Sequence, residues 1–163
     1  MRKLENKKHD YVFAYTHHPH PVPHKMAEKI LEEGSGYYPE LTKEDEALLI
    51  KYHEEGMKIG HACMNECAYV MGTAPESVHL EYLGIEDGES RHKFDFLSEA
   101  KISAHTWPYD YPNAFSGGDP YGCNERIGKA AIRIASEEIA RRIKIFKDDE
   151  TLWNAHQEFI RGW

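Results

Sequence analysis

The strongest folding signal in this 163-residue chain is an amphipathic segment at about residues 123–146. Ile139 and Ile143 recur on one face at helical spacing, and charged side chains occupy the opposite face. Glu125 precedes Lys129 by four residues, and this arrangement of opposite charges stabilises a helix. The segment therefore predicts one long helix, whose apolar face must be covered by other parts of the chain.

Capping residues predict three further helices. One begins near Pro23 and ends at Gly34, because glycine readily adopts the left-handed backbone with which many helices end. Thr42 suits the N-cap of the next helix, with Asp45 three residues later in a capping-box position. A terminal helix is expected at about residues 148–161.

Strand signals are fewer than helix signals. Residues 11–16 form an apolar, aromatic run, and residues 77–83 alternate apolar with polar side chains. Because strand and helix signals alternate along the chain, the sequence favours an α/β fold with a parallel or mixed sheet. We expect a single domain over residues 1–163, with too few strands for a complete sheet.

Composition narrows the class of protein. The chain is 40% apolar and 29% charged, which is typical of a globular protein, and no stretch approaches the ~20 apolar residues of a membrane span. The first ten residues contain no apolar signal segment, and an odd number of cysteines, three, argues against a secreted disulfide framework. We therefore expect a cytoplasmic protein. Its net charge of −8 disfavours binding to nucleic acids and anionic membranes.

The segment "HHPHPVPH", residues 17–24, contains the densest group of histidines. Neutral imidazoles suit zinc, copper or nickel, so His17, His18, His20 and His24 could form a metal site of their own. However, the prolines stiffen the loop, and neighbouring side chains of an extended segment point to opposite faces. Since loops that leave the carboxyl ends of parallel strands build ligand sites, we instead expect His17 or His18 to face a ligand.

A second candidate site lies in "GHACMNEC", residues 60–67. His61 and Glu66 are five residues apart, roughly 140° around an ideal helix, and so do not share a helical face. They converge on one pocket if His61 precedes a helix and Glu66 lies in its first turns. Metal-assisted hydrolysis requires such a pair, a carboxylate that binds the ion and a histidine that transfers the proton. The alternative is a buried histidine and a glutamate that the helix dipole favours.

Two other motifs have structural interpretations that we prefer. Cys63 and Cys67 could bind zinc together with His61, but no fourth ligand is evident, so buried small apolar side chains are the better interpretation. The Gly-Gly-Asp-Pro motif at residues 117–120 could bind a phosphate at a helix start. It lacks the Lys-Ser/Thr of a P-loop, which favours a structural turn.

Two of these segments occur in an order that resembles the creatininase family. "GHACMNECAYVMGTAPESVHLE" resembles that family's His-Ala/Gly-Gly, Glu-Thr-Ser and Pro-x-x-Val segment. "GGDPYGCNERIGKAAIRIASEEIARRI" is similar to its later Gly-Asp-Pro turn and long amphipathic helix. The strand signal in "YVFAYTHH" falls where the family has a strand before its substrate-gating loop. The resemblance covers about residues 11–147.

The resemblance implies a role for each matching residue. Members of the family are metal-dependent amidohydrolases that cleave cyclic or linear amides, have an α/β/α layered fold, and often form hexamers. Glu66 matches a ligand to one of two divalent metals, zinc or manganese, and His61 matches the histidine proposed to shuttle protons. His17 lies near the position of an aromatic residue that shields the substrate, and Lys58 replaces an aspartate near it. We predict His61 as catalytic, Glu66 as a metal ligand, and His17, His18 and Lys58 as substrate-binding.

The family's other metal ligands lie in upstream motifs that this chain lacks. We therefore expect a partial three-layer α/β/α creatininase-like sheet that a second polypeptide completes, with two metals in the shared site and a higher oligomer overall. The substrate would be a small-molecule amide. Two alternatives remain, a non-catalytic structural or regulatory subunit of such a complex, and an independent protein that binds metal through its histidine loop.

Overall fold

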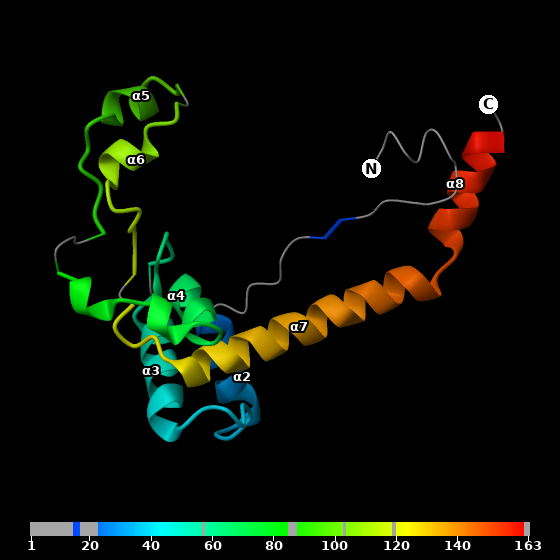
Figure 1. The fold of residues 1–163 in the computed structure, drawn as a ribbon, viewed down its shortest axis with the longest axis horizontal. Helices are drawn as coiled ribbons and strands as arrows, with labels where there is room; N and C mark the ends of the chain where they lie inside the picture. Colours follow the sequence, from blue (N-terminus) through cyan, green and yellow to red (C-terminus); the bar gives the residue numbers. More distant parts are fainter. Residues whose placement is uncertain are drawn as a thin grey trace. The chain divides into compact units, whose positions relative to one another are not determined.

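The computed structural model describes residues 15–16, 23–56, 58–84, 88–102, 104–118 and 120–161. Figure 1 follows the chain through its helices. These are α2 (Pro23–Glu33), α3 (Lys43–Glu54), α4 (Met64–Met71), α5 (Asp95–Glu99), α6 (Trp107–Asp110), α7 (Glu125–Asp148) and α8 (Thr151–Arg161), with two short 3-10 helices, η1 (Pro75–Ser77) and η2 (Leu80–Tyr82). The terminal helix expected at about residues 148–161 is α8.

The predicted α/β fold is wrong for the part of the chain that the structure describes. There the regular elements are all helical, and no strand of the partial three-layer α/β/α sheet is formed. Residues 77–83 form parts of η1 and η2 instead, and the amide of Leu83 donates to the carbonyl of Leu80 at 3.1 Å. Pro75 starts η1, because its fixed φ suits a helical first turn. The strand predicted at 11–16 lies outside the described residues except for Tyr15 and Thr16, which form none.

Contacts divide the chain into two compact units, and the boundary falls within α7. One unit comprises residues 1–20 and 135–163, and the other comprises residues 21–134. In the first unit, Arg142 donates a hydrogen bond of 2.7 Å to the hydroxyl of Thr16 and another of 2.7 Å to Glu138. Whether these two units belong to the single domain expected over residues 1–163 is not decided by their contacts, and the single domain stays a prediction.

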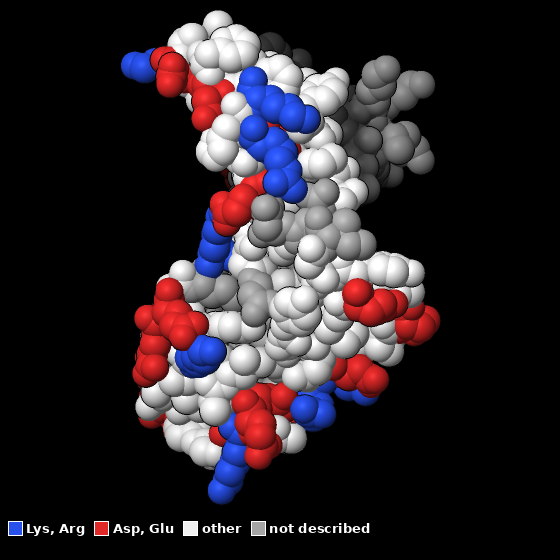
Figure 2. Space-filling model, turned by 90° about the vertical axis from the view of Figure 1, so that its left-hand side faces the viewer, with Lys and Arg blue, Asp and Glu red and all other residues white. Residues whose placement is uncertain are grey.

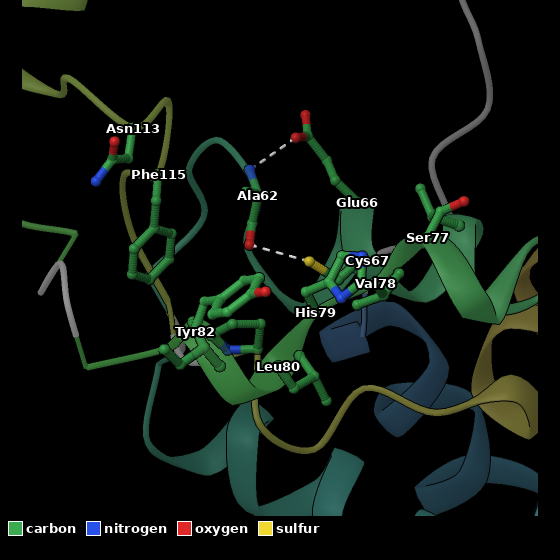
Figure 3. Close-up of a pocket in the computed structure, with 13 residues that line it drawn as sticks. Ala62, Glu66, Cys67, Ser77, Val78, His79, Leu80, Tyr82, Asn113 and Phe115 are labelled. Carbon is green, nitrogen blue, oxygen red and sulfur yellow. Dashed lines mark hydrogen bonds between the residues drawn. The ribbon is translucent and has the colours of Figure 1, made fainter.

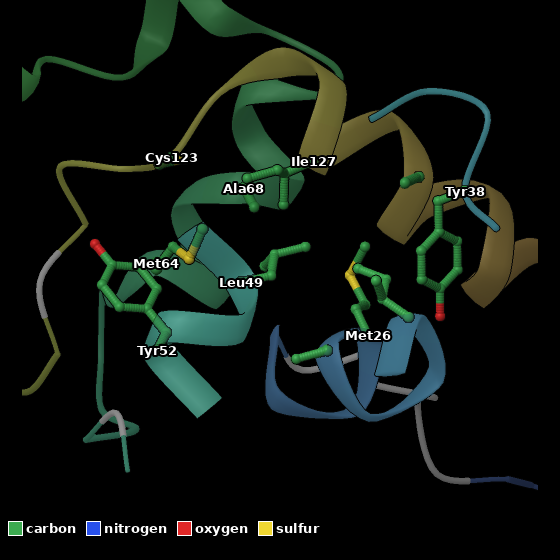
Figure 4. Packing of buried hydrophobic residues seen from close by; sticks show 11 residues of the cluster. Met26, Tyr38, Leu49, Tyr52, Met64, Ala68, Cys123 and Ile127 are labelled. Atoms are coloured by element: carbon green, nitrogen blue, oxygen red, sulfur yellow. The ribbon is translucent and has the colours of Figure 1, made fainter. Parts of the chain in front are cut away.

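The core of the 21–134 unit is built from four helices. Figure 4 shows how side chains from α2, α3, α4 and the first turns of α7 meet in it. Each helix contributes two buried side chains or more, among them Met26 and Ile30, Leu49 and Tyr52, Met64 and Ala68, and Ile127 and Ala130. Met64, the first residue of α4, is fully buried in this cluster, which thereby fixes the start of α4 and with it the candidate site.

The capping predictions are confirmed. Thr42 and Asp45 form the expected capping box at the start of α3, and Gly34 follows α2 with a φ of +96°. The long helix predicted at 123–146 is α7, which begins at Glu125 and ends at Asp148. Glu125 and Lys129 form the expected pair, with 3.0 Å between the carboxylate oxygen and Nζ.

Helices α4 and α7 meet through two glycines. A Cβ on Gly128 would lie 2.1 Å from the carbonyl oxygen of Ala68 and 2.5 Å from the backbone nitrogen of Gly72. A Cβ on Gly72 would lie 2.6 Å from the carbonyl carbon of Gly128. Only residues without side chains allow two backbones to approach this closely, so the glycine pair sets the distance between the two helices.

Acidic and basic side chains are interspersed on the face of the molecule shown in Figure 2. They follow one another along the left edge and the lower part of this view, beside a broad uncharged area. Within the described residues, no helix is both long enough and apolar enough to cross a membrane.

Candidate functional site

The structure brings His61 and Glu66 together at the start of α4. Cys63 is the N-cap of this helix, so His61 lies in the preceding turn and Glu66 lies in the first turn. His61 Nδ1 lies 3.3 Å from Glu66 Oε2, and the amide of Ala62 donates to the same oxygen at 2.8 Å. This is the arrangement under which the sequence allows the two side chains to converge. Both remain accessible, with exposed side-chain fractions of 61% and 50%.

A second segment, residues 116–118, holds the turn that carries His61. The amide of Ser116 donates to the carbonyl of His61 at 2.9 Å, and its hydroxyl accepts from the amide of His61 at 3.0 Å. The amide of Gly118 donates to the carbonyl of Lys58 at 2.8 Å. A Cβ on Gly60 would lie 1.5 Å from the carbonyl oxygen of Ser116, so glycine is required there. The segment at residues 116–118 therefore fixes the backbone position of the turn that carries His61.

Two aromatic rings lie beside His61 in sequence-distant positions. The ring centroid of Trp107, in α6, lies 5.1 Å from that of His61, and Tyr111 stacks on Trp107 at 5.4 Å and 27°. Trp107 thus restricts the orientations of the imidazole through contact with its ring. Sequence reasoning did not connect these residues, because nothing local indicates that side chains 46 positions apart will touch.

A cavity of about 430 Å³ adjoins the pair (Figure 3). Ala62, Glu66 and Cys67 form one side of it, and the other sides come from η1, η2 and the segment before α7. The lining residues are Ala62, Glu66, Cys67, Val70, Ser77, Val78, His79, Leu80, Tyr82, Leu83, Asn113, Phe115 and Pro120. Leu80 and Tyr82, which belong to the alternation that predicted a strand, line this cavity from η2, and Val78 lines it from the residue after η1. Ser77 and His79 line it as well, so the alternation does not separate one face from another.

The three cysteines are free thiols, and burial favours the protonated form of two of them, Cys67 and Cys123. Burial raises the pKa of Cys67, and it raises the pKa of Cys123 to about 12. Cys67 Sγ donates to the carbonyl of Ala62 at 3.2 Å, and Cys63 is fully buried. A protonated thiol is a weak nucleophile and a poor metal ligand, in agreement with a packing role for these side chains.

Of the residues predicted to bind substrate, only Lys58 lies in the described part of the chain, and its predicted role stays a prediction. Lys58 Nζ pairs with both carboxylate oxygens of Glu89, each at 3.1 Å. His17 and His18 are not among the described residues, and neither is His20. The structure therefore joins His61 with Glu66, while Lys58 has an acidic partner of its own.

The donor atoms of His61 and Glu66 suit part of a metal site. Zinc and manganese both accept imidazole nitrogen and carboxylate oxygen, and here the two donor types lie 3.3 Å apart on accessible side chains. Among the described residues, no three His, Cys, Asp or Glu side chains are grouped so that they could hold an ion. Glu66 thus fits as one ligand of a larger set, with His61 beside it as the group that can move a proton.

Comparisons with known proteins give no match. No model of a protein family matches the chain. No curated protein and no solved structure matches it either.

Proposed function

We propose that the chain is a subunit of a metal-dependent amidohydrolase that cleaves the C–N bond of a cyclic or linear amide. The observation that supports this function is the His61–Glu66 pair, 3.3 Å apart beside a cavity of about 430 Å³. A catalytic zinc ion uses three protein ligands or more. A second polypeptide would therefore supply the further ligands, and the two chains would share a site for two metal ions.

Each residue has a distinct task in this proposal. A bound zinc or manganese ion would polarise the amide carbonyl and lower the pKa of a bound water. Glu66 would hold the ion, and the amide of Ala62 fixes its carboxylate by a hydrogen bond of 2.8 Å. His61 transfers the proton to the departing nitrogen through Nε2, because its Nδ1 faces Glu66. Trp107 keeps the imidazole in place through ring contact.

The second candidate is a non-catalytic structural or regulatory subunit. The hydrogen bond between Glu66 and the amide of Ala62 favours it, since a first-turn glutamate that accepts from the preceding turn stabilises a helix start without any chemistry. In that case Glu66 contributes to α4 alone, and its charge has no effect on metal content or activity.

Glu66→Gln separates the two candidates. The glutamine oxygen still accepts from the amide of Ala62, so we expect the fold of the chain to be kept while the negative charge is lost. In the complex isolated from its own source, we expect at least a ~100-fold loss of amide hydrolysis and the loss of one metal ion per pair of chains. Activity assays and elemental analysis of the same preparation measure both effects.

Asp95→Asn is the matched control, because Asp95 Oδ2 lies 2.9 Å from Nδ1 of His92 in another exposed histidine–carboxylate pair. This variant should keep its metal and its activity. Unchanged metal content and activity in Glu66→Gln would reject the catalytic proposal and favour the structural one. A native mass spectrum of the unaltered complex tests the shared site directly. A metal-free assembly of this chain alone would contradict it.

A further inference from the structure

We infer that the cavity beside Glu66 binds an apolar group of the substrate, so that the substrate is an uncharged amide with a side group of about the size of a phenyl ring. This inference rests on the proposed function for the reaction itself. The binding of the apolar group rests on the cavity alone. The cavity thus assigns a substrate class within the broad group of cyclic and linear amides.

The walls of the cavity are mainly hydrocarbon. Two neighbouring parts of the chain contribute them, α4 and the pair η1 and η2, together with a third part distant in sequence, the segment before α7. The apolar lining comprises Val70, Val78, Leu80, Leu83, Phe115 and Pro120. Such a lining favours an apolar ligand, because contact with it removes hydrocarbon surface from water on both sides.

Several polar groups of the lining already have partners within the chain. Cys67 Sγ donates to the carbonyl of Ala62 at 3.2 Å, and Figure 3 shows the thiol directed towards that carbonyl. His79 Nδ1 lies 2.8 Å from a carboxylate oxygen of Glu81, and its ring lies 5.5 Å from that of Tyr82. Because their hydrogen-bonding atoms already have partners within the chain, these two side chains help to form the walls of the cavity and are poorly placed to bind polar groups of a ligand.

The negative charge of Glu66 at the edge of the cavity favours an uncharged ligand over a negatively charged one. Glu66 is the carboxylate of the lining, and half of its side chain is exposed. In the chain without metal, a carboxylate on the ligand would be repelled there, whereas an uncharged amide would not. A volume of about 430 Å³ lies within the range of pockets for small molecules, so a phenyl group with a short amide fits it.

Binding to the isolated full chain without added metal tests the inference. The probes are phenylacetamide and acetamide, which differ in the phenyl group alone, and the readout is the shift of ¹³C-labelled methyl signals in NMR spectra. We expect phenylacetamide to shift the methyl signals of Val78, Leu80 and Leu83 in a saturable way. We expect acetamide to bind at least ~10-fold more weakly, because it cannot fill the cavity.

A variant that fills the cavity provides the second measurement. Val70 lines the cavity and is 40% exposed, so Val70→Trp should block it without disturbing the core. We expect this change to weaken phenylacetamide binding at least ~10-fold. Ile145→Trp is the matched control, because Ile145 is an exposed residue of α7 that is not part of the lining. Equal affinity for both probes, or full affinity in Val70→Trp, would overturn the inference.

Hydrolysis by the complex separates this inference from the proposed function. Selective binding of phenylacetamide by the chain, together with a complex that hydrolyses neither amide, would overturn the proposed function and leave the apolar site supported. Hydrolysis of both amides with the same kcat/KM would support the function and overturn the substrate class. If both proposals are right, kcat/KM for phenylacetamide exceeds that for acetamide at least ~10-fold.

Discussion

Gly128→Ala is expected to destabilise the 21–134 unit by about 2 kcal/mol, although alanine favours a helix over glycine by about 1 kcal/mol. The new Cβ would lie 2.1 Å from the carbonyl oxygen of Ala68 and 2.5 Å from the nitrogen of Gly72. Both contacts are with backbone atoms of α4 and the residue that ends it, so no side chain can move aside. The two helices must separate, which opens the core around Ile127.

Urea denaturation of the full chain, followed by circular dichroism, measures this effect. Ser136→Ala is the control, since Ser136 is an exposed residue of the same helix where alanine should stabilise by up to about 0.5 kcal/mol. A gain in stability for Gly128→Ala similar to that of the control would show that α4 and α7 do not approach as closely as described.

Asp45→Ala is expected to lower the free energy of unfolding by about 3 kcal/mol at neutral pH. Asp45 is buried, and it accepts hydrogen bonds from Arg126 Nε at 2.6 Å, from Arg126 Nη2 at 3.0 Å and from Asn124 Nδ2 at 2.8 Å. Its other contacts, with Thr42, complete the capping box of α3. Asn124 in turn accepts from the amides of Arg126 and Ile127 at the start of α7. One carboxylate thus joins the first turns of two helices.

The loss of unfolding free energy in Asp45→Ala should depend on pH. Burial alone would raise the pKa of Asp45, but the hydrogen bonds from Arg126, Thr42 and Asn124 outweigh it and lower the pKa from 3.8 to about 2. A folded-state pKa below that of the unfolded chain adds stability above about pH 4, and this contribution is lost as the pH falls towards 2. Urea denaturation at several pH values should therefore show the difference between Asp45→Ala and the unaltered chain shrinking over this interval.

Glu138→Ala is the control for this second prediction. Glu138 also pairs with arginines, Arg141 and Arg142, but this pairing is on the surface and within one helix. Solvent screens such pairs, so we expect a much smaller loss of stability than for Asp45→Ala. A loss for Asp45→Ala as small as that of the control would contradict the role of the buried carboxylate.

The sequence predicted most helices correctly because their signals are local. Thr42 and Asp45 are three residues apart, and the glycine that ends α2 adjoins it, so the information lies within one turn of helix. The sheet was predicted wrongly because alternation over seven residues is too short a signal to decide the backbone conformation. Residues 77–83 contribute to two 3-10 helices instead, and Pro75 favours the first of them.

The candidate site could be predicted only in part, for a related reason. His61 and Glu66 lie five residues apart, so their meeting depends on where one helix begins. The contacts of His61 with Ser116 and Trp107 depend on the tertiary fold, which brings together segments that are far apart in the sequence. A local sequence pattern does not predict such contacts. The likeness of "GHACMNEC" to a metal-binding motif indicated the pair, but it could not indicate the apolar cavity beside it.

The carboxylate that joins α3 to α7 also has a consequence for synthesis on the ribosome. Asp45 meets Arg126 across 81 residues of chain, and Ile127 completes the core around Leu49 and Met64. While the ribosome adds those residues, the apolar sides of α3 and α4 lack the partner that later covers them. We therefore expect the nascent chain to expose this apolar surface until α7 emerges from the exit tunnel, and chaperones bind such surfaces during synthesis.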